Sequence, residues 1–246
     1  MSPRERIVIV GGGPAGLAAA RAYRAAGGGG EVTILAGERH PPYRRPPLSK
    51  EFLRGAMARA ELPIEPPRWF AEHDIALRAG TEAAVLEPER GRVVTVHDEV
   101  FPFDACLLAT GSEPARPPLP GADDPEVLVL RTVEDSERLA ARALPGVRAV
   151  VIGAGFIGCE AAASLAMRGA RVTVVAPEEL PQEARLGDEV GRRIAGWLEE
   201  HGVRLALGCE VEAIAPAEGG GRVVRAAGAE HPADLVLLAA GARPRL

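Results

Sequence analysis

Lysine is nearly absent from this sequence, and the one that remains lies in a distinctive segment. Among 29 Lys and Arg side chains, only Lys50 is a lysine, and it ends the run PPYRRPPLSK at residues 41–50. A lysine ammonium is a compact charge on a flexible stem, whereas an arginine guanidinium is a wide planar fork that keeps its proton. A site beside a redox ring, with room for one small charge, could accept the first and exclude the second. GC-rich coding is the alternative explanation, because the chain also has no Asn and a single Gln.

Two glycine-rich turns provide the second kind of chemistry. Residues 11–16 read GGGPAG and residues 153–158 read GAGFIG, so each follows the pattern G-x-G-x-x-G. Between a strand and a helix, the first Gly makes a tight turn, the second lets backbone approach a pyrophosphate, and the third lets the helix pack on the strand. The helix N-terminus adds N–H donors and partial positive charge. Two dinucleotides are therefore predicted, and the turn residues expected to bind them are Gly11, Gly13, Pro14, Ala15, Gly16, Gly153, Gly155, Phe156, Ile157 and Gly158.

The elements that must position these turns form an internal repeat. Each turn is predicted to lie between a β-branched strand and an Ala-rich helix, with a second strand after the helix. The ranges are 6–10, 14–26 and 31–35 in the first copy, and 148–152, 156–168 and 171–175 in the second. Each copy also closes with an apolar strand and a small-residue turn, at residues 104–111 and 234–241. From these closing turns we expect Ala109, Thr110, Gly111 and Gly241 to contribute to cofactor binding.

The remaining segments are assigned from their patterns. Alternating stretches near residues 82–86, 92–97, 210–214 and 222–226 predict antiparallel strands appended to each copy. Residues 187–201 predict an amphipathic helix, and the proline-rich residues 113–125 predict a connector. The long segment at residues 38–73 holds Lys50 and is predicted to be a functional excursion with one or two short helices.

Acidic residues after the second strand of each copy are the predicted partners of the ribose hydroxyls. In the first copy Glu38 lies slightly beyond the usual position, and in the second Ala176 occupies that position while Glu178 follows it. No Arg takes the place of the acid in the second copy, so a 2′-phosphate would have no counter-ion there. This favours NAD over NADP.

Composition narrows the class of protein. The 246 residues suffice for one large domain or two ordinary ones, and 47% apolar with 26% charged residues is typical of a globular protein. A net charge of −5 without a basic block argues against nucleic acid as a partner. No apolar run fits a signal peptide or a membrane span, so we expect a cytoplasmic location. The three cysteines, Cys106, Cys159 and Cys209, form no C-x-x-C pair and are predicted to be small buried apolar residues, with no metal site.

Five segments together resemble one branch of a flavoprotein superfamily. They are VIVGGGPAGLAAA (8–20), PYRRPPLSKEFL (42–53), LLATGSEP (107–114), VVIGAGFIGCEAA (150–162) and LLAAGARP (237–244). They resemble the FAD-dependent pyridine nucleotide-disulfide oxidoreductases, in the branch that contains ferredoxin reductases and apoptosis-inducing factor. The pattern P-Y-x-R-P-P-L-S-K is specific, and it separates this branch from the dithiol reductases, which carry a cysteine pair in that region.

The resemblance implies roles for individual residues. It gives Gly11, Gly13 and Gly16 the FAD pyrophosphate and the second turn the NAD pyrophosphate. Arg45 resembles the family's FAD-contacting Arg. Lys50 resembles the Lys beside the flavin ring, and Glu160 the Glu that pairs with it near the nicotinamide. A cation near the flavin would stabilise negative charge on the reduced ring, and a carboxylate would hold that cation in place. An ordinary first-turn acid, favoured by the helix dipole, is the alternative interpretation of Glu160.

The resemblance also implies the domain organisation. The predicted fold is α/β with two Rossmann-like three-layer nucleotide-binding domains, the FAD domain being interrupted by an inserted NAD(P) domain. The predicted ranges are 1–114, 115–242 and, for the start of a return to the FAD domain, 243–246. In this family the returning chain supplies a strand with a G-D motif and an interface domain. The sequence ends at Leu246 without that motif, so we expect the FAD-type sheet to lack its last parallel strand.

The function implied by the resemblance is that of an oxidoreductase. NADH would pass hydride to FAD, and the electrons would leave to an iron–sulfur protein or a small-molecule acceptor. Two alternatives stay open: a nucleotide-binding or signalling module without turnover, and a fragment that functions only with another polypeptide. The absence of the C-terminal FAD segment favours these alternatives.

Overall fold

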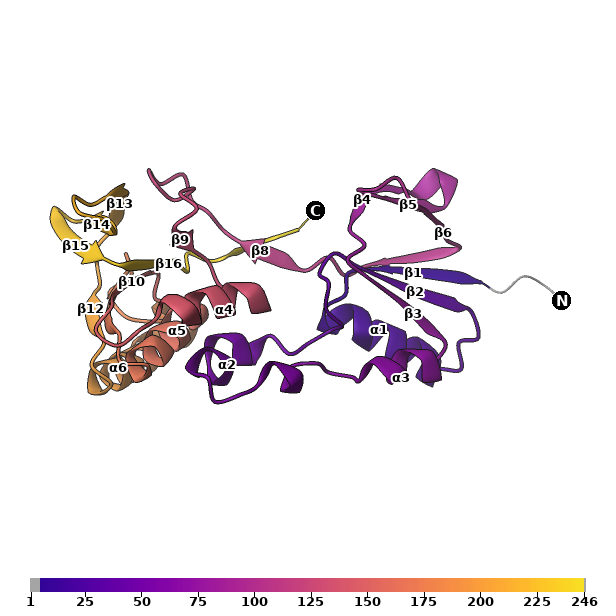
Figure 1. Cartoon of the computed structure of the whole chain (residues 1–246), viewed down its shortest axis with the longest axis horizontal. Helices are drawn as coiled ribbons and strands as arrows, with labels where there is room; N and C mark the ends of the chain where they lie inside the picture. The colour runs from indigo at the N-terminus through magenta and orange to yellow at the C-terminus, as the bar shows by residue number, and fades with distance from the viewer. Residues whose placement is uncertain (1–4, 246) are drawn as a thin grey trace. The chain divides into compact units, whose positions relative to one another are not determined.

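The computed structural model describes residues 5–245 (Figure 1). The chain forms two compact units. Of the described residues, the first unit comprises 5–44, Ala60–Ser112 and 244–245, and the second comprises Arg45–Arg59 and Glu113–Arg243.

The first unit is a three-layer α/β structure. Its elements are β1 (Arg6–Val10), α1 (Pro14–Ala25), β2 (Glu31–Ala36), all but the first residue of the 3₁₀ turn η2 (Arg59–Glu61), α3 (Pro67–Glu72), β3 (Ile75–Ala79), β4 (Ala83–Glu87), η3 (Pro88–Arg90), β5 (Arg92–Thr95), β6 (Val100–Pro102) and β7 (Ala105–Leu108). A parallel sheet has the order β3-β2-β1-β7, and β4-β5-β6 form an antiparallel sheet. Figure 1 shows the helices and the antiparallel strands on opposite sides of the parallel sheet.

Side-chain alternation along β1 explains these layers. Ile9 packs with Leu17 of α1 and Phe70 of α3 on one face. Val8 packs on the other face, with Val93 of β5. Because successive side chains of a strand point to opposite faces, a strand such as β1, which has apolar side chains on both faces from Ile7 to Val10, must be covered on both sides.

The second unit repeats this architecture. Its elements are η1 (Pro46–Ser49), α2 (Glu51–Arg54), β9 (Val127–Leu128), α4 (Val133–Arg142), β10 (Arg148–Ile152), α5 (Phe156–Met167), β11 (Arg171–Val175), α6 (Glu183–Glu200), β12 (Arg204–Ala206), β13 (Val211–Pro216), β14 (Arg222–Ala226), β15 (Ala229–Ala233) and β16 (Leu235–Leu238). The parallel sheet has the order β12-β11-β10-β16-β9, and β13-β14-β15 are antiparallel. Val150 and Leu238 of the parallel sheet form one core with Ile214 and Val224 of the antiparallel strands. Two further short strands, β8 (Ser112–Pro114) and β17 (Ala242–Pro244), pair with each other.

An ion pair recurs at the same place in each unit. Arg6 donates to Asp104 from its backbone N–H and its guanidinium, at 2.8–3.1 Å. Arg148 and Asp234 make the same set of contacts at 2.6–3.0 Å. These hydrogen bonds from the arginines lower the pKa of each carboxyl from its usual 3.8 to about 2. Each pair joins the start of the first strand to the residue before the closing strand.

The predicted α/β fold is confirmed, and the predicted antiparallel strands are present in both units. One helix differs in its start: α6 begins at Glu183, and Gly187 has a positive φ of 75° that kinks it. The segment 38–73 contains two short α-helices, α2 and α3, in agreement with the prediction of one or two, and it also contains the two 3₁₀ turns η1 and η2. Of the cysteines, Cys159 is buried, whereas Cys106 and Cys209 are half-buried against apolar clusters.

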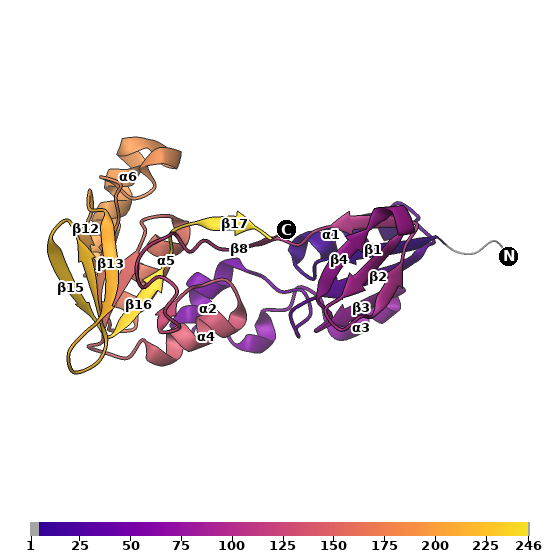
Figure 2. The same cartoon turned by 90° about the horizontal axis from the view of Figure 1, so that it is seen from above.

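Apart from boundary shifts of one or two residues at 113–114 and 243, the compact units differ from the predicted domain ranges in one segment. Arg45–Arg59 belongs to the second unit, where α2 packs on α4 and α5 (Figure 1 and Figure 2). The predicted range 1–114 places this segment with the FAD-binding part. The assignment of a cofactor to each range stays a prediction.

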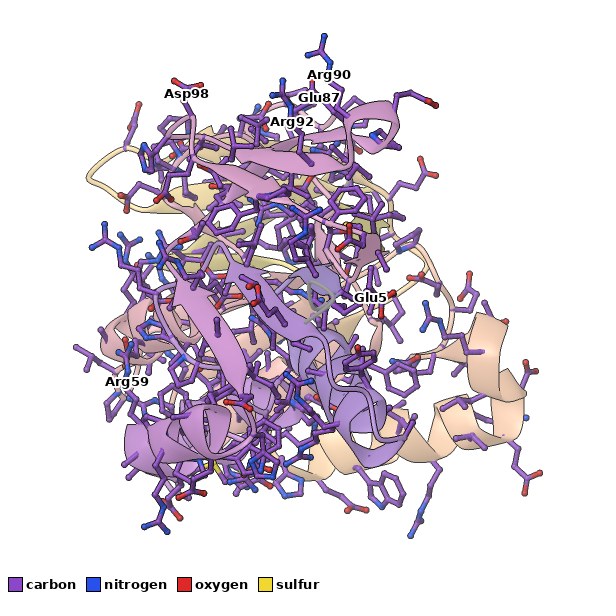
Figure 3. All side chains as sticks on the ribbon, turned by 90° about the vertical axis from the view of Figure 1, so that its right-hand side faces the viewer. Glu5, Arg59, Glu87, Arg90, Arg92 and Asp98 are labelled. Atoms are coloured by element: carbon purple, nitrogen blue, oxygen red, sulfur yellow. The ribbon has the colours of Figure 1, made fainter. Side chains whose placement is uncertain are left out.

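Charged side chains also organise the surface of the first unit. Glu87 accepts hydrogen bonds from Arg90, at 3.1 Å, and from Arg92, at the end of the antiparallel sheet (Figure 3). The hydrogen bond from Arg92 is the main cause that lowers the pKa of Glu87. Because all three side chains are near solvent, we expect this cluster to contribute little to stability.

Candidate functional site

The first glycine-rich turn lies between β1 and α1 and contains one open glycine. A Cβ atom on Gly11, whose φ is 128°, would lie 2.0 Å from the carbonyl oxygen of Ala109. A Cβ on Gly16 would lie 2.1 Å from the carbonyl oxygen of Gly11. A Cβ on Gly13, which precedes the first residue of α1, would meet no atom within 4 Å. The outer glycines are therefore required by packing, whereas the middle one faces open space.

The second turn, between β10 and α5, has the same arrangement. A Cβ on Gly153, with a φ of 109°, would lie 2.5 Å from the carbonyl oxygen of Ala239, and one on Gly158 would lie 2.0 Å from that of Gly153. A Cβ on Gly155, which precedes α5, would again meet no atom within 4 Å. An open middle glycine at a helix N-terminus fits the close approach of a pyrophosphate to backbone N–H groups.

The closing turns lie against these glycines. The N–H of Ala109 donates to the carbonyl of Val10 at 2.8 Å, and the N–H of Ala239 donates to the carbonyl of Ile152 at 2.8 Å. Thr110 and Gly111 follow in the first unit, and Gly241 follows in the second; both of these glycines have positive φ, 77° and 105°. Because a positive φ favours Gly, these turns depend on their glycines for their shape.

The two predicted ribose-binding acids lie in different surroundings. Glu38 is half-buried after β2 and accepts a hydrogen bond of 2.6 Å from the hydroxyl of Tyr43. Glu178 is exposed after β11, beyond the buried Ala176, and its carbonyl accepts from the N–H of Gly208 at 3.0 Å. The roles of both acids stay predictions. Tyr43, which orients the first acid, was missed in the sequence because nothing in the motif indicated which side chain it contacts.

A cation lies beside the second turn. The first two residues of α5, Phe156 and Ile157, are exposed, and the guanidinium carbon of Arg185 lies 5.7 Å from the centre of the Phe156 ring. Arg185 belongs to the first turn of α6. Sequence reasoning looked for an Arg at the end of the second strand and missed this one, because α6 begins earlier than its pattern indicated.

Lys50 and Glu160 form the predicted pair. The Nζ of Lys50 lies 2.7 Å from Oε2 of Glu160, and it also donates to the carbonyl of Pro46 at 3.1 Å. Both side chains remain about one-third exposed, at 35% and 30%. The hydroxyl of Ser49 donates to the same Oε2 at 2.6 Å. One carboxylate oxygen therefore holds an ammonium and a hydroxyl, which fixes the direction of the ammonium.

Arg45, five residues before Lys50, belongs to the second unit. Its Nη1 donates to the carbonyl of Arg131 at 2.9 Å. The predicted contact of Arg45 with FAD stays a prediction.

Two further buried polar groups lie near the second turn. Cys159 of α5 donates to the carbonyl of Ala154 at 3.2 Å, and burial, with smaller contributions from Glu160 and Glu178, raises the pKa of its thiol to about 11. Gln182 is buried, and its backbone N–H donates to Ala154, but its side-chain Nε2 has no hydrogen-bond partner. A thiol with a raised pKa is a poor nucleophile, so Cys159 is not suited to redox chemistry.

Among residues 5–245, no three or more His, Cys, Asp or Glu side chains are arranged to hold a metal ion. In the same range, no helix combines the length and the apolar character that crossing a membrane would require.

Comparison with curated proteins shows extended similarity. The chain is 35% identical over 241 residues to rhodocoxin reductase of Rhodococcus erythropolis, covering 98% of this chain and 56% of the relative. It is 33% identical over 246 residues to the ferredoxin–NAD(+) reductase subunit of the benzene 1,2-dioxygenase system of Pseudomonas putida, covering 98% and 58%. The chain therefore spans somewhat more than half the length of these relatives.

Solved structures show the same fold. A chain of the covalent putidaredoxin reductase–putidaredoxin complex matches with a TM-score of 0.93 and 28% identity, over 99% of this chain and 60% of that one. The ferredoxin reductase of the CYP199A2 system of Rhodopseudomonas palustris matches with a TM-score of 0.91 and 31% identity, over 97% and 59%.

A family model reaches almost every residue of the chain. It is the model described as pyridine nucleotide-disulphide oxidoreductase, and it matches residues 5–246. The paired glycine turns, which the structure places at equivalent positions of two α/β units, lie within that range. The chain belongs to the pyridine nucleotide-disulphide oxidoreductase family.

Proposed function

We propose that the chain is the nucleotide-binding part of an FAD-dependent NADH oxidoreductase, with FAD at the first turn and NADH at the second. The observation that supports this best is the pair of open glycines, Gly13 and Gly155, each at the start of a helix. In both turns the flanking glycines have no room for a side chain, so the open position has a different purpose from theirs. Backbone N–H groups at these helix ends would bind the two pyrophosphates.

When bound, FAD would supply the redox chemistry, taking a hydride equivalent from NADH, releasing its two electrons one at a time to an acceptor and its proton to solvent. The side chains of the protein have no proton to transfer in this scheme. Their contribution is to position the nucleotides and to provide a fixed charge.

Lys50 is the residue that we propose to provide this charge. Its ammonium is partly exposed and is held at 2.7 Å by Glu160, which lies one turn into α5. A fixed cation near the reacting ring would stabilise the negative charge that develops when the ring is reduced. A preorganised cation is worth more than a mobile one because the protein does not have to reorganise around it during the reaction.

For the second site we propose NADH over NADPH. Ala176 is buried where an acid or a phosphate-binding Arg would stand, and the exposed Glu178 would repel a 2′-phosphate. Arg185, beside Phe156, is the cation that could oppose this preference. If it did so, Arg185→Ala would weaken NADPH binding more than NADH binding, which titration of both nucleotides would measure.

The acceptor that we propose is a small iron–sulfur protein. Its support is the names of the relatives, which include ferredoxin–NAD(+) and rubredoxin–NAD(+) reductases. For the location we propose the cytoplasm. A nucleotide-binding module without turnover is the second candidate, since the two open glycines would bind nucleotides whether or not electrons pass between them.

Turnover with an artificial acceptor separates the two candidates. The purified protein would be supplied with FAD and mixed with NADH and ferricyanide, and ferricyanide reduction would be followed with and without FAD. FAD-dependent reduction is the expected result. Tight binding of both nucleotides without any reduction would favour the non-catalytic module.

A further inference from the structure

Two buried serines hold the segment that carries Lys50. The hydroxyl of Ser136, on α4, donates to the carbonyl of Leu48 at 2.7 Å. The hydroxyl of Ser164, on α5, donates to the carbonyl of Ser49 at 2.7 Å. Ser136 and Ser164 are 0% and 1% exposed, so water cannot replace either hydrogen bond. The two carbonyls directly before Lys50 are thus both fixed by helices of the second unit.

Ser49 is attached to α5 at two points. Its carbonyl accepts from Ser164, and its hydroxyl donates to Oε2 of Glu160 at 2.6 Å. Glu160 and Ser164 are four residues apart, so they lie on the same face of the helix, one turn apart. This double attachment aligns the segment with α5 and brings Lys50 to the same carboxylate.

Arg168, the residue after α5, holds the far end of the segment. Its guanidinium donates to the carbonyl of Leu53 at 3.1 Å, and to the carbonyls of Ala140 and Ala143 at 2.8 and 3.3 Å. Residues 48–53 are therefore bound to α4 and α5 at both ends, and Lys50 lies between the two attachments.

The alternative explanation is that Ser136 and Ser164 are ordinary buried serines, whose hydroxyls bond to these carbonyls only because every buried hydroxyl needs a partner. In a helix that partner is commonly the carbonyl one turn earlier in the same helix. Ser136 and Ser164 instead donate to carbonyls that lie 88 and 115 residues away in the sequence, and these carbonyls are adjacent. Two helices thus supply the same chemical group to consecutive residues of one segment, which is the arrangement expected for positioning.

We propose that Ser136 and Ser164 are positioning residues, which hold Lys50 on Glu160 so that the ammonium–carboxylate pair is assembled before a nucleotide binds. The consequence for catalysis rests on the proposed function. The positioning itself does not, because it concerns contacts within one unit of the protein without cofactor.

The single lysine makes this testable by proteolysis. A lysine-specific protease can cut the chain at only one place, after Lys50. Ser136→Ala removes the hydroxyl that donates to the carbonyl of Leu48, and Ser164→Ala removes the one that donates to the carbonyl of Ser49. We expect each substitution to raise the rate of cleavage after Lys50 roughly 10-fold, because cleavage follows the population of the open segment. Thr95→Val is the matched control, since its buried hydroxyl accepts from His97 and Glu99 in the other unit.

Selective ¹⁵N labelling of lysine gives an independent readout. The labelled protein should show one backbone amide signal, from Lys50, which should shift or broaden in Ser164→Ala and stay unchanged in Thr95→Val. Ser164→Cys, which keeps a weak donor of similar size, should be intermediate. Each readout uses the single substitutions, because a double variant that failed to fold would not report on the position of Lys50.

With FAD bound, both serine variants should slow flavin reduction by NADH and leave the Kd for NADH within about 2-fold, a shift of about 0.4 kcal/mol. The proposal would be overturned if both variants were cleaved at the parent rate and also kept the parent's Lys50 signal. If the parent itself shows no flavin reduction, the proposed function fails, whereas the proteolysis and the labelling still decide whether the serines position Lys50.

Discussion

The same substitution should change different properties at two glycines of the second turn that lie three residues apart. In Gly158→Ala the new methyl carbon would lie 2.0 Å from the backbone carbonyl oxygen of Gly153, so α5 has to move away from the turn. In Gly155→Ala the methyl meets no protein atom within 4 Å, and the φ of −73° suits any residue. The first substitution should therefore affect stability, and the second should affect nucleotide binding.

The sizes follow from these distances. Relieving the Gly158 clash needs a shift of more than about 1 Å in packed backbone, which we place at about 3 kcal/mol, at the upper end for overpacking. For a chain of this size that corresponds to a fall in Tm of roughly 6–12 °C. For Gly155→Ala we expect a stability change below about 1 kcal/mol, because only the residue before the helix is altered. Its Kd for NADH should rise about 10- to 100-fold, since the methyl fills the space of the pyrophosphate.

Thermal unfolding and NADH titration of the two variants test this reasoning. The titration of Gly158→Ala is done well below its melting temperature. A parent-like Kd in Gly155→Ala would refute the binding of a pyrophosphate at this turn. A parent-like Tm in Gly158→Ala would refute the close packing of helix and turn. Gly13→Ala and Gly16→Ala provide the same comparison for FAD in the first unit, because their surroundings match.

Three further outcomes are expected. Lys50→Ala should slow flavin reduction on the order of 10- to 1000-fold while NADH still binds. Lys50→Arg should also reduce the flavin slowly, because the guanidinium is wider than the ammonium. If stopped-flow measurements find the parent rate of reduction in both variants, Lys50 has no part in the mechanism. Stability should be lost as the pH falls from 3.8 toward about 2, because Asp104 and Asp234 have lowered pKa values in the folded state and take up protons in the unfolded state first. In Asp234→Asn the free energy of unfolding, measured with urea at several pH values, should fall less steeply with decreasing pH than in the parent. The same pH dependence in both proteins would argue against the ion pair as the cause of the acid sensitivity. Iodoacetamide at pH 8 should leave Cys159 unmodified, since burial holds its pKa near 11, and peptide mapping that finds rapid alkylation would contradict its burial.

The repeat of strand, turn and helix could be predicted from the sequence because its signals are local. The β-branched strands 6–10 and 148–152 have the predicted bounds in the structure, and α1 and α5 end within one residue of the predicted positions. Glycine spacing, apolar runs and helix composition all indicate the same elements there. Agreement between local signals is what makes an element predictable.

The attachment of the Lys50 segment could not be predicted in this way. Nothing local indicates that Ser136 and Ser164 bind carbonyls at residues 48 and 49, because both serines look like ordinary helix residues. The sequence pattern groups residues 45–59 with their neighbours along the chain, whereas in the structure α2 packs on α4 and α5. Contacts across such long separations follow from tertiary packing, which a sequence pattern does not contain. The pairing of Lys50 with Glu160 was predicted from the resemblance to a family, and the structure contains it. The Nε2 of Gln182, which has no hydrogen-bond partner, had no signal in the sequence.

In the proposed function one chain binds FAD and NADH and lets electrons pass between them. Anaerobic mixing of the FAD-loaded protein with NADH in a stopped-flow spectrophotometer tests it most directly, because it needs no acceptor. The visible flavin absorbance should bleach in a single turnover, and Gly155→Ala should require more NADH for the same rate. Flavin that stays oxidised in the presence of saturating, bound NADH would contradict the proposed function.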